Sequence, residues 1–383
     1  MTWSTKRVIA GPIIASTAFV MELALVPLLL PVIQDDHSLT IRQLAWFFNS
    51  YSFAVAVGVL AGGWIGDVFG AKRVFSAGVL MFTIGALIVA SSQSLGTMLG
   101  GRILQGLGGG IFSPLIPVLL TRALPVQPGR ILVIWGSITG YFAAFAPLAV
   151  GPTVSIFGWQ SIFVLFAALS GVALVLSGKK GTGRRKARKE PLPSLMSIFA
   201  ATKLWMVFGY IFCTYGAIIL YLFQLPLRLT DLGLGPADIG VVLAVLWLSF
   251  SIVGTLLRNW VDGPHLQKIV YAAPLLIAAG FAVGWLSSGW SVTILSAVLL
   301  GAGFASGNAP STLLVLKFAP DGLKAFSTSL DITFARLGGV ATVGLLSLLS
   351  ASHSLLVVLF LSATALMLSL LFSEKPELVT SKQ

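Results

Sequence analysis

Four ionisable side chains lie inside long apolar runs of this sequence, where a charge is costly to place. Two of them are acids, Glu22 and Asp331, and two are bases, Arg102 and Arg336. A charge at the centre of a membrane span costs roughly 2.5–3.5 kcal/mol on insertion scales, so such residues are candidates for function. Burial also disfavours the ionised carboxyl group, so a proton can bind and leave as access to water changes. We therefore predict proton coupling through Glu22, Arg102 and Asp331.

These residues also have simpler interpretations. Glu22 could be a structural carboxylate satisfied by neighbouring helices, and Asp331 lies near the mouth of its predicted helix. Arg102 and Arg336 could pair with the two acids and neutralise the interior. Arg102 could instead hold a substrate carboxylate or take part in a proton relay. Both arginines are therefore also candidate substrate-binding residues.

A second charged group lies in a very short connection between two apolar runs, within residues 58–75. A single acid is followed there by a glycine and a basic pair. An acid near the membrane surface can bind a basic side chain or the positive end of a helix dipole. Such contacts lock one arrangement of helices and release it in another. We predict a gate formed by Gly63, Asp67, Gly70, Lys72 and Arg73; the alternative is a simple turn between helices.

Small and aromatic residues supply the remaining candidates. Gly58, Gly62, Gly66 and Gly70 recur every fourth residue, which places them on one helix face and lets another helix approach closely. Aromatic residues at span ends are typical of interfacial anchors. Tyrosines in the middle of spans could instead line a cavity for a ring-bearing ligand, and the candidates are Tyr141, Tyr210 and Tyr215.

Membrane-spanning helices must position all of these residues. The 383 residues are 57% hydrophobic and only 9% charged, which excludes a soluble globule. A span needs about 20 apolar residues. The apolar runs predict an all-α integral membrane protein with twelve spans, at about 8–33, 42–66, 73–92, 95–121, 131–153, 158–177, 204–224, 238–258, 269–286, 290–315, 326–350 and 353–372.

A long hydrophilic stretch at 179–193 separates six apolar runs from six more. We predict a six-helix bundle at 1–178, a basic cytoplasmic linker at 179–200, and a second six-helix bundle with a short tail at 201–383. The duplication is weak, because Arg258 stands in the second half where the first half has Asp67. A gate built from charge should therefore be asymmetric.

The distribution of basic residues orients the chain. Most of the 24 Lys and Arg residues fall in predicted inside segments, whereas the outside loops hold only Arg42 and Arg228. This is the positive-inside pattern, which places both termini in the cytoplasm of an inner-membrane protein. The net charge of +12 thus indicates orientation and contact with anionic lipid rather than nucleic-acid binding. The first apolar run is longer than a signal core, so we predict a retained span.

Several other classes of site are not supported. The glycine-rich runs 106–110 and 301–307 lie inside apolar segments, and the sequence has no Gly-Lys-Ser/Thr ending of a phosphate loop. The three histidines lie near loops without HExxH spacing, and Cys213 is the single cysteine. We expect no metal, no cofactor and no enzymatic activity, and we expect a monomer.

The short charged connection resembles a signature of the major facilitator superfamily. Gly63, Asp67, Gly70 and Lys72 fit the glycine–acid–glycine–basic spacing of that family's loop. The positions directly after Asp67 and Gly70, where basic residues are common, hold valine and alanine, and Arg73 supplies a neighbouring charge.

Further segments resemble the drug:proton antiporter branch of this family. Glu22 precedes a proline at the spacing of the first-span signature, and residues 46–51 resemble the start of the second span. Residues 100–110 are similar to the fourth-span motif. Residues 146–151 are a degraded form of the fifth-span antiporter motif. The resemblance covers essentially the whole chain and is weaker in the second half. There, only the Leu-Gly-Gly that follows Arg336 loosely resembles a motif of the eleventh span.

The resemblance implies a carrier that alternates access to a site between two six-helix halves. Our first hypothesis is a proton-coupled exporter of small organic molecules, such as drug-like compounds or metabolites. The degraded fifth-span motif leaves open an uptake carrier for a vitamin, siderophore or other nutrient. A channel, receptor or intramembrane enzyme is a remote alternative, because no selectivity filter, soluble sensor or catalytic pair is visible.

Overall fold

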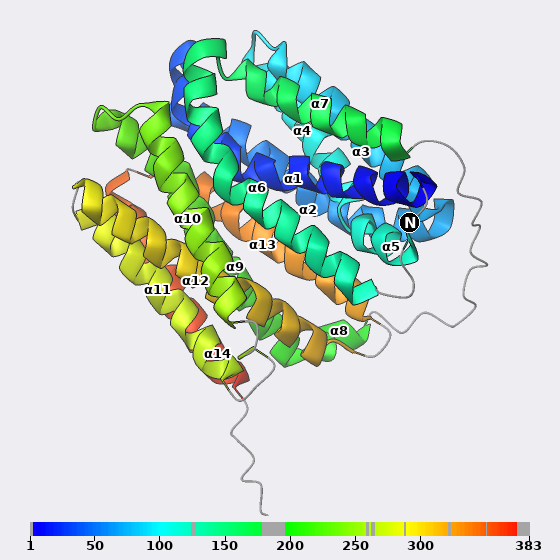
Figure 1. Cartoon of the computed structure of the whole chain (residues 1–383). Helices are drawn as coiled ribbons and strands as arrows, with labels where there is room; N and C mark the ends of the chain where they lie inside the picture. The colour runs from blue at the N-terminus through cyan, green and yellow to red at the C-terminus, as the bar shows by residue number, and fades with distance from the viewer. Residues whose placement is uncertain are drawn as a thin grey trace, which may run out of the picture.

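The computed structural model describes residues 3–123, 128–177, 196–257, 260–261, 265–286, 289–320, 323–349 and 351–373, apart from some side chains, including that of Asp67. Every regular element in these ranges is helical (Figure 1). In chain order they are α1 (Trp3–Asp36), α2 (Ile41–Phe69), α3 (Ala71–Ala90), α4 (Leu95–Phe112), α5 (Leu115–Ala123), α6 (Pro128–Phe157), α7 (Gln160–Ser177), α8 (Met196–Ala200), α9 (Thr202–Asp231), α10 (Pro236–Leu257), α11 (Leu266–Leu286), α12 (Trp290–Phe318), α13 (Lys324–Leu346), the 3₁₀ turn η1 (Ala351–His353) and α14 (Ser354–Phe372).

The helices account for the predicted spans. Within the described ranges, eleven helices are long and apolar enough to cross a membrane, and α4 with α5 makes a twelfth span. These two helices are bent by 41° relative to each other. Pro114 lies in the break and has no N–H to continue the helix. The prediction of an all-α protein with twelve spans is confirmed, and the span predicted at 95–121 is a bent pair.

Glycines hold α2 close to α4. A Cβ atom at Gly58 would lie 2.7 Å from the carbonyl oxygen of Leu107, and one at Gly62 would lie 2.7 Å from the Cα of Ile111. Backbone atoms cannot yield as a flexible side chain can, so only glycine permits this approach. On α4, a Cβ at Gly110 would lie 2.8 Å from the Cα of Gly58. The glycine spacing of residues 58–66 is therefore explained by helix packing.

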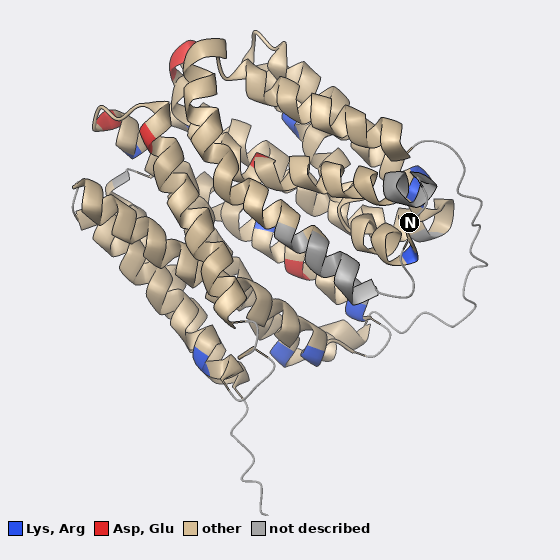
Figure 2. Ribbon diagram, in the orientation of Figure 1, with Lys and Arg blue, Asp and Glu red and all other residues tan. Residues whose placement is uncertain are grey.

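The two ends of the bundle differ in charge. We call the end that holds the connections 37–40, 158–159 and 232–235 the distal end, and the opposite end, where α1 begins, the proximal end. Basic residues gather at the proximal end and acidic residues at the distal end (Figure 2). The proximal residues include Arg122, Lys203, Lys268, Lys317 and Lys324, and the distal acids include Asp35, Asp36, Asp231 and Asp238.

Helices of the N-terminal half (α1–α7) meet helices of the C-terminal half (α8–α14) through α2 with α13, α6 with α10, and α1 with both α9 and α10. Near the distal end, Asn49 Nδ2 donates to the carbonyl oxygen of Val340 at 3.0 Å, and the rings of Phe48 and Phe223 are 5.6 Å apart. A Cβ at Gly151 would lie 2.6 Å from the carbonyl oxygen of Pro236. The halves thus approach closely near the distal end.

The predicted division into bundles at 1–178 and 201–383 stays a prediction. Most of the predicted linker, 179–200, lies outside the described residues. Its last residues form the short helix α8, in which Ile198 is buried and its carbonyl oxygen accepts a hydrogen bond from Trp205 Nε1 at 3.0 Å.

Candidate functional site

Glu22 and Arg102 form a buried ion pair between α1 and α4. The distance between Arg102 Nη1 and Glu22 Oε1 is 2.6 Å, and the two side chains are 1% and 3% exposed. Nη1 also donates to Gln105 Oε1 at 3.1 Å, and Nε donates to the carbonyl oxygen of Phe47 at 3.4 Å. A charge-assisted hydrogen bond in a low-dielectric interior is strong, and the pair neutralises both buried charges.

Aromatic rings surround the Arg102 guanidinium. Its Cζ atom lies 4.4 Å from the centroid of the Tyr51 ring, 5.0 Å from that of Phe47 and 5.8 Å from that of Phe163. Cation–π attraction is stronger where water is excluded. These rings hold the guanidinium in place without supplying a second anion, so protonation of Glu22 would leave Arg102 without a negative partner among the residues it contacts.

One buried polar atom beside this pair, Gln105 Nε2, has no hydrogen-bond partner among the described residues. The hydroxyl of Tyr51 is also buried and lies beside the Glu22 carboxylate. Leaving a buried donor unpaired is costly, by about 1–3 kcal/mol. The pair therefore has beside it a buried amide donor whose hydrogen bond is not made in the observed arrangement.

A second polar cluster lies in the C-terminal half, on α9, α12 and α13. Tyr215 Oη hydrogen-bonds to Asn308 Oδ1, and Thr312 Oγ1 donates to Asp331 Oδ2 at 2.7 Å. Asp331 is 6% exposed. Of the three residues predicted to couple protons, Glu22 and Arg102 are in direct contact, whereas Asp331 is bonded within the other half.

Arg336 lies where the two halves meet. Its guanidinium is 5.7 Å from the ring of Phe19 on α1. Phe19, Tyr215, Asn308, Thr312 and Arg336 all lie well inside their helices, yet each is partly exposed. These five residues come from both halves, and we call the place that they border the central region. The structure thus brings partly accessible polar and aromatic side chains together there.

The three predicted tyrosines occupy different environments. Tyr210 is fully buried inside the C-terminal half, where its hydroxyl donates to the carbonyl oxygen of Val270 at 2.9 Å and its ring packs on Phe372. Tyr141 is 62% exposed and stacks on Phe145, which is also exposed, on the outer surface of α6. Only Tyr215 lies beside Arg336 and Asn308. The structure therefore separates the predicted substrate residues.

The predicted gate lies at the proximal end of α2 and α3. Gly70 has a φ of +94° between the two helices, a conformation that favours glycine. Lys72 is half-buried and Arg73 is exposed in the first turn of α3. Among the described residues, no atom outside the helix's own backbone lies within 4 Å of where a Cβ at Gly63 would be. The side chain of Asp67 lies outside the described residues, so the gate stays a prediction.

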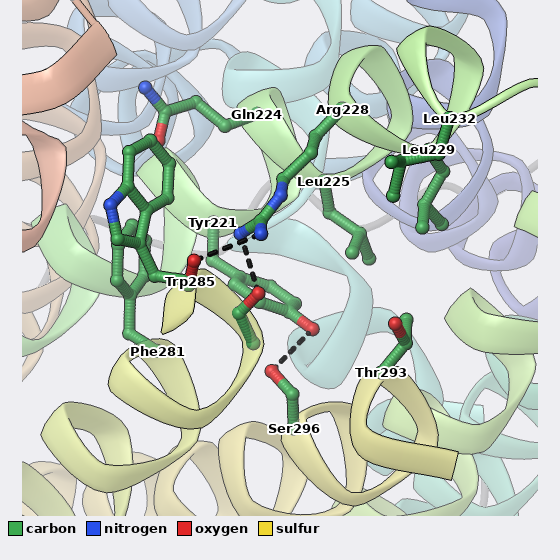
Figure 3. A pocket seen from close by; sticks show the side chains of 11 residues that line it. Tyr221, Gln224, Leu225, Arg228, Leu229, Leu232, Phe281, Trp285, Thr293 and Ser296 are labelled. Atoms are coloured by element: carbon green, nitrogen blue, oxygen red, sulfur yellow. Dashed lines mark hydrogen bonds between the residues drawn. The ribbon is translucent and has the colours of Figure 1, made fainter. Parts of the chain in front are cut away.

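A cavity lies within the C-terminal half, between α9, α11 and α12 near the distal end (Figure 3). Arg228 Nη2 donates to the carbonyl oxygen of Trp285 at 2.9 Å, and Nη1 donates to that of Gly284. Tyr221 Oη and Ser296 Oγ are 3.0 Å apart. A cation at the last carbonyls of a helix is favourable, so Arg228 stabilises the end of α11.

Some residues of the ion-pair site and of the central region were not predicted from the sequence. Asn308 and Thr312 are polar residues in an apolar span, which is a signal that could have identified them. Gln105 follows Arg102 by about one helical turn, so the contact between the two side chains could have been predicted from their spacing. Phe19 gave no comparable signal, because one aromatic residue among many is unremarkable in a membrane helix.

These features define a multi-pass membrane protein with a buried ion pair and a polar region between two helical halves. The family model of the Major Facilitator Superfamily matches residues 13–343. The chain belongs to this superfamily, and the resemblance noted from the sequence is confirmed.

Among curated relatives, the multidrug resistance protein B homolog of Mycobacterium tuberculosis is 32% identical over 143 residues, which cover 37% of this chain and 26% of that protein. The tetracenomycin C resistance and export protein of Streptomyces glaucescens is 31% identical over 148 residues, covering 38% and 27%. The riboflavin transporter RibZ of Clostridioides difficile is 29% identical over 150 residues, covering 39% and 33%. The matches thus span about a quarter to a third of these relatives.

Solved structures show the same fold. The nucleoside transporter NupG has a TM-score of 0.76 at 14% identity, with 96% of this chain and 98% of that chain covered. A D-xylose-proton symporter has a TM-score of 0.73 at 15% identity, with 97% and 96% covered. At these identities the likeness concerns the fold alone.

Proposed function

We propose that this chain is a proton-coupled secondary active transporter that exports small organic molecules by alternating access. The buried Glu22–Arg102 pair carries the proposal. Protonation of Glu22 would remove its charge and leave Arg102 unpaired in a low-dielectric interior, so the helices that hold the two residues would rearrange. In this mechanism the proton is exchanged as the site opens to one side and then to the other.

The charge of the two ends supports an orientation. The basic proximal end would face the cytoplasm and the acidic distal end the outside, as the positive-inside rule requires. Both termini would then be cytoplasmic, in an inner membrane. The close contacts between halves near the distal end fit a state closed to the outside. The basic linker would lie against anionic lipid, and the working unit would be a monomer.

Tyr215 and Arg336 are the predicted substrate residues that fit this site best. Both border the region between the halves, and Asn308 and Phe19 extend it with an amide and a ring. Asp331 would add a second proton site in the C-terminal half, separate from Glu22. The predicted gate at Gly63, Asp67, Gly70, Lys72 and Arg73 would act at the proximal end.

Everted membrane vesicles test proton-coupled export. Respiration acidifies their lumen, and an exporter that exchanges solute for protons will alkalinise it when a transported compound is added. We expect this response from the wild-type protein and its loss in Glu22→Gln, with protein amount matched. If no compound in a panel of aromatic acids, amines and neutral rings changes the lumenal pH in wild-type vesicles, the proposal fails.

An uptake carrier is the second candidate, and one observation favours it: the riboflavin transporter RibZ is among the relatives. Labelled riboflavin distinguishes the two directions. Faster entry into intact cells that express the chain favours uptake, whereas faster loss from preloaded cells favours export. A matched strain that carries the empty vector gives the background rate.

A further inference from the structure

Arg336 is a cation in the central region that has no acidic partner among the residues the structure describes. Among the described residues, no salt bridge and no hydrogen bond involves its guanidinium. Arg336 is partly exposed, so it borders accessible space rather than being enclosed in packed protein. A charge in the membrane interior is stabilised when an opposite charge reaches it.

The two acids inside the spans are both engaged elsewhere. Glu22 binds Arg102 at 2.6 Å, and Asp331 accepts a hydrogen bond from Thr312 at 2.7 Å. Asp331 and Arg336 are five residues apart on α13, which separates them by about 140° around the helix and about 7.5 Å along it. A solute in the accessible space would meet the partly exposed Arg336 before the buried Asp331.

The surroundings of Arg336 are aromatic as well as polar. The ring of Phe19 lies 5.7 Å from the guanidinium. Tyr215 and Tyr51 are close enough to interact electrostatically with it. Tyr215 also packs edge-to-face on Phe304. Flat apolar groups are bound well by such rings. The guanidinium presents a planar set of donors that matches a carboxylate.

We propose that the solute carried by this protein is an organic anion with an aromatic ring, whose acid group is bound by Arg336. This inference rests on the proposed function, because it names the substrate class of that transporter. A neutral solute would leave the Arg336 charge uncompensated, and a cation would be repelled by it. An anion supplies the counter-charge that the described part of the chain does not provide.

Equilibrium binding to purified protein in detergent tests this assignment without a proton gradient. The probe is 1-naphthoate, with 1-naphthamide as the neutral comparator and 1-naphthylmethylamine as the cation, followed by calorimetry. We expect naphthoate to bind at least about tenfold more tightly than naphthamide, as for a hydrogen bond to a charged group. Arg336→Gln should abolish that preference, and Arg336→Lys should retain part of it. Arg42→Gln, which removes an exposed charge at the distal end, should retain all of it.

Two results would overturn the inference: wild-type protein without a preference for the anion, or Arg336→Gln with the wild-type preference. The first needs no variant and holds even if Arg336→Gln does not fold. Failure of the proposed function would look different. Anion binding that depends on Arg336, without proton-driven transport, would reject the transporter mechanism but keep this site. Coupled transport of neutral solutes that is unaffected by Arg336→Gln would reject this anion site but keep the transporter mechanism.

Discussion

The Glu22–Arg102 ion pair lies wholly inside the N-terminal half, whereas Arg336 faces that half from the other side and pairs with no acid in the described ranges. The two arginines therefore differ in what they require. Arg102 has its counter-charge and depends on the protonation state of Glu22. Arg336 depends on something that enters the space between the halves. This difference separates a coupling site from a solute site.

The first prediction concerns the energy of the buried pair. Replacing Arg102 by methionine leaves the Glu22 carboxylate buried and unpaired, which should lower the free energy of unfolding by about 3–5 kcal/mol. The double variant Glu22→Gln with Arg102→Met removes both charges and should be more stable than Arg102→Met alone. Unfolding in mixed detergent, followed by tryptophan fluorescence, measures both values. Strictly additive losses would show that the two residues do not interact.

The second prediction separates packing from gating at two adjacent glycines. Gly62→Ala should destabilise the protein by about 1–3 kcal/mol, because the new Cβ would overlap backbone atoms of Ile111 on α4. Gly63→Ala is the matched control, since beyond its own helix backbone no described atom lies within 4 Å of its Cβ position. The thermal unfolding midpoint should fall for Gly62→Ala only. A slower transport rate in a fully stable Gly63→Ala would support the predicted gate, and equal midpoints for both variants would contradict the packing.

The third prediction concerns the contact between α6 and α10 at the distal end. In Gly151→Ala, the new Cβ would lie 2.6 Å from the carbonyl oxygen of Pro236 and 2.7 Å from the Cα of Ala237, so the distal end should close less completely. We expect greater labelling, by an impermeant thiol reagent, of a cysteine introduced at Ala237. Gly140→Ala on the same helix is the control, because its Cβ would make an ordinary 3.9 Å contact with Ser251. Unchanged labelling in Gly151→Ala would show that this contact does not seal the distal end.

The sequence predicted the spans well because twenty apolar residues in a row have few alternatives in a membrane. It also identified Glu22 and Arg102, since intramembrane charges are rare and costly. The sequence did not decide which acid pairs with Arg102, because Asp331 carries the same charge as Glu22. Only the arrangement of the helices shows that Glu22 is the partner. Tyr210 and Tyr141 show the limit most clearly. Both are tyrosines inside predicted spans, but one is buried within a half and the other is on an exposed face, a difference set by helix rotation.

The last prediction tests whether Asp331 is a second proton site. Asp331→Asn keeps an oxygen that can accept the hydrogen bond from Thr312, so the unfolding midpoint should change little. The variant cannot bind and release a proton, so transport should depend less steeply on the pH gradient than in the wild type. Initial rates in proteoliposomes over a series of imposed gradients measure this dependence. Asp231→Asn, at an exposed position near the distal end, controls for the loss of one negative charge. If Asp331→Asn and the wild type respond to the gradient alike, Asp331 is a structural residue and coupling belongs to Glu22 alone.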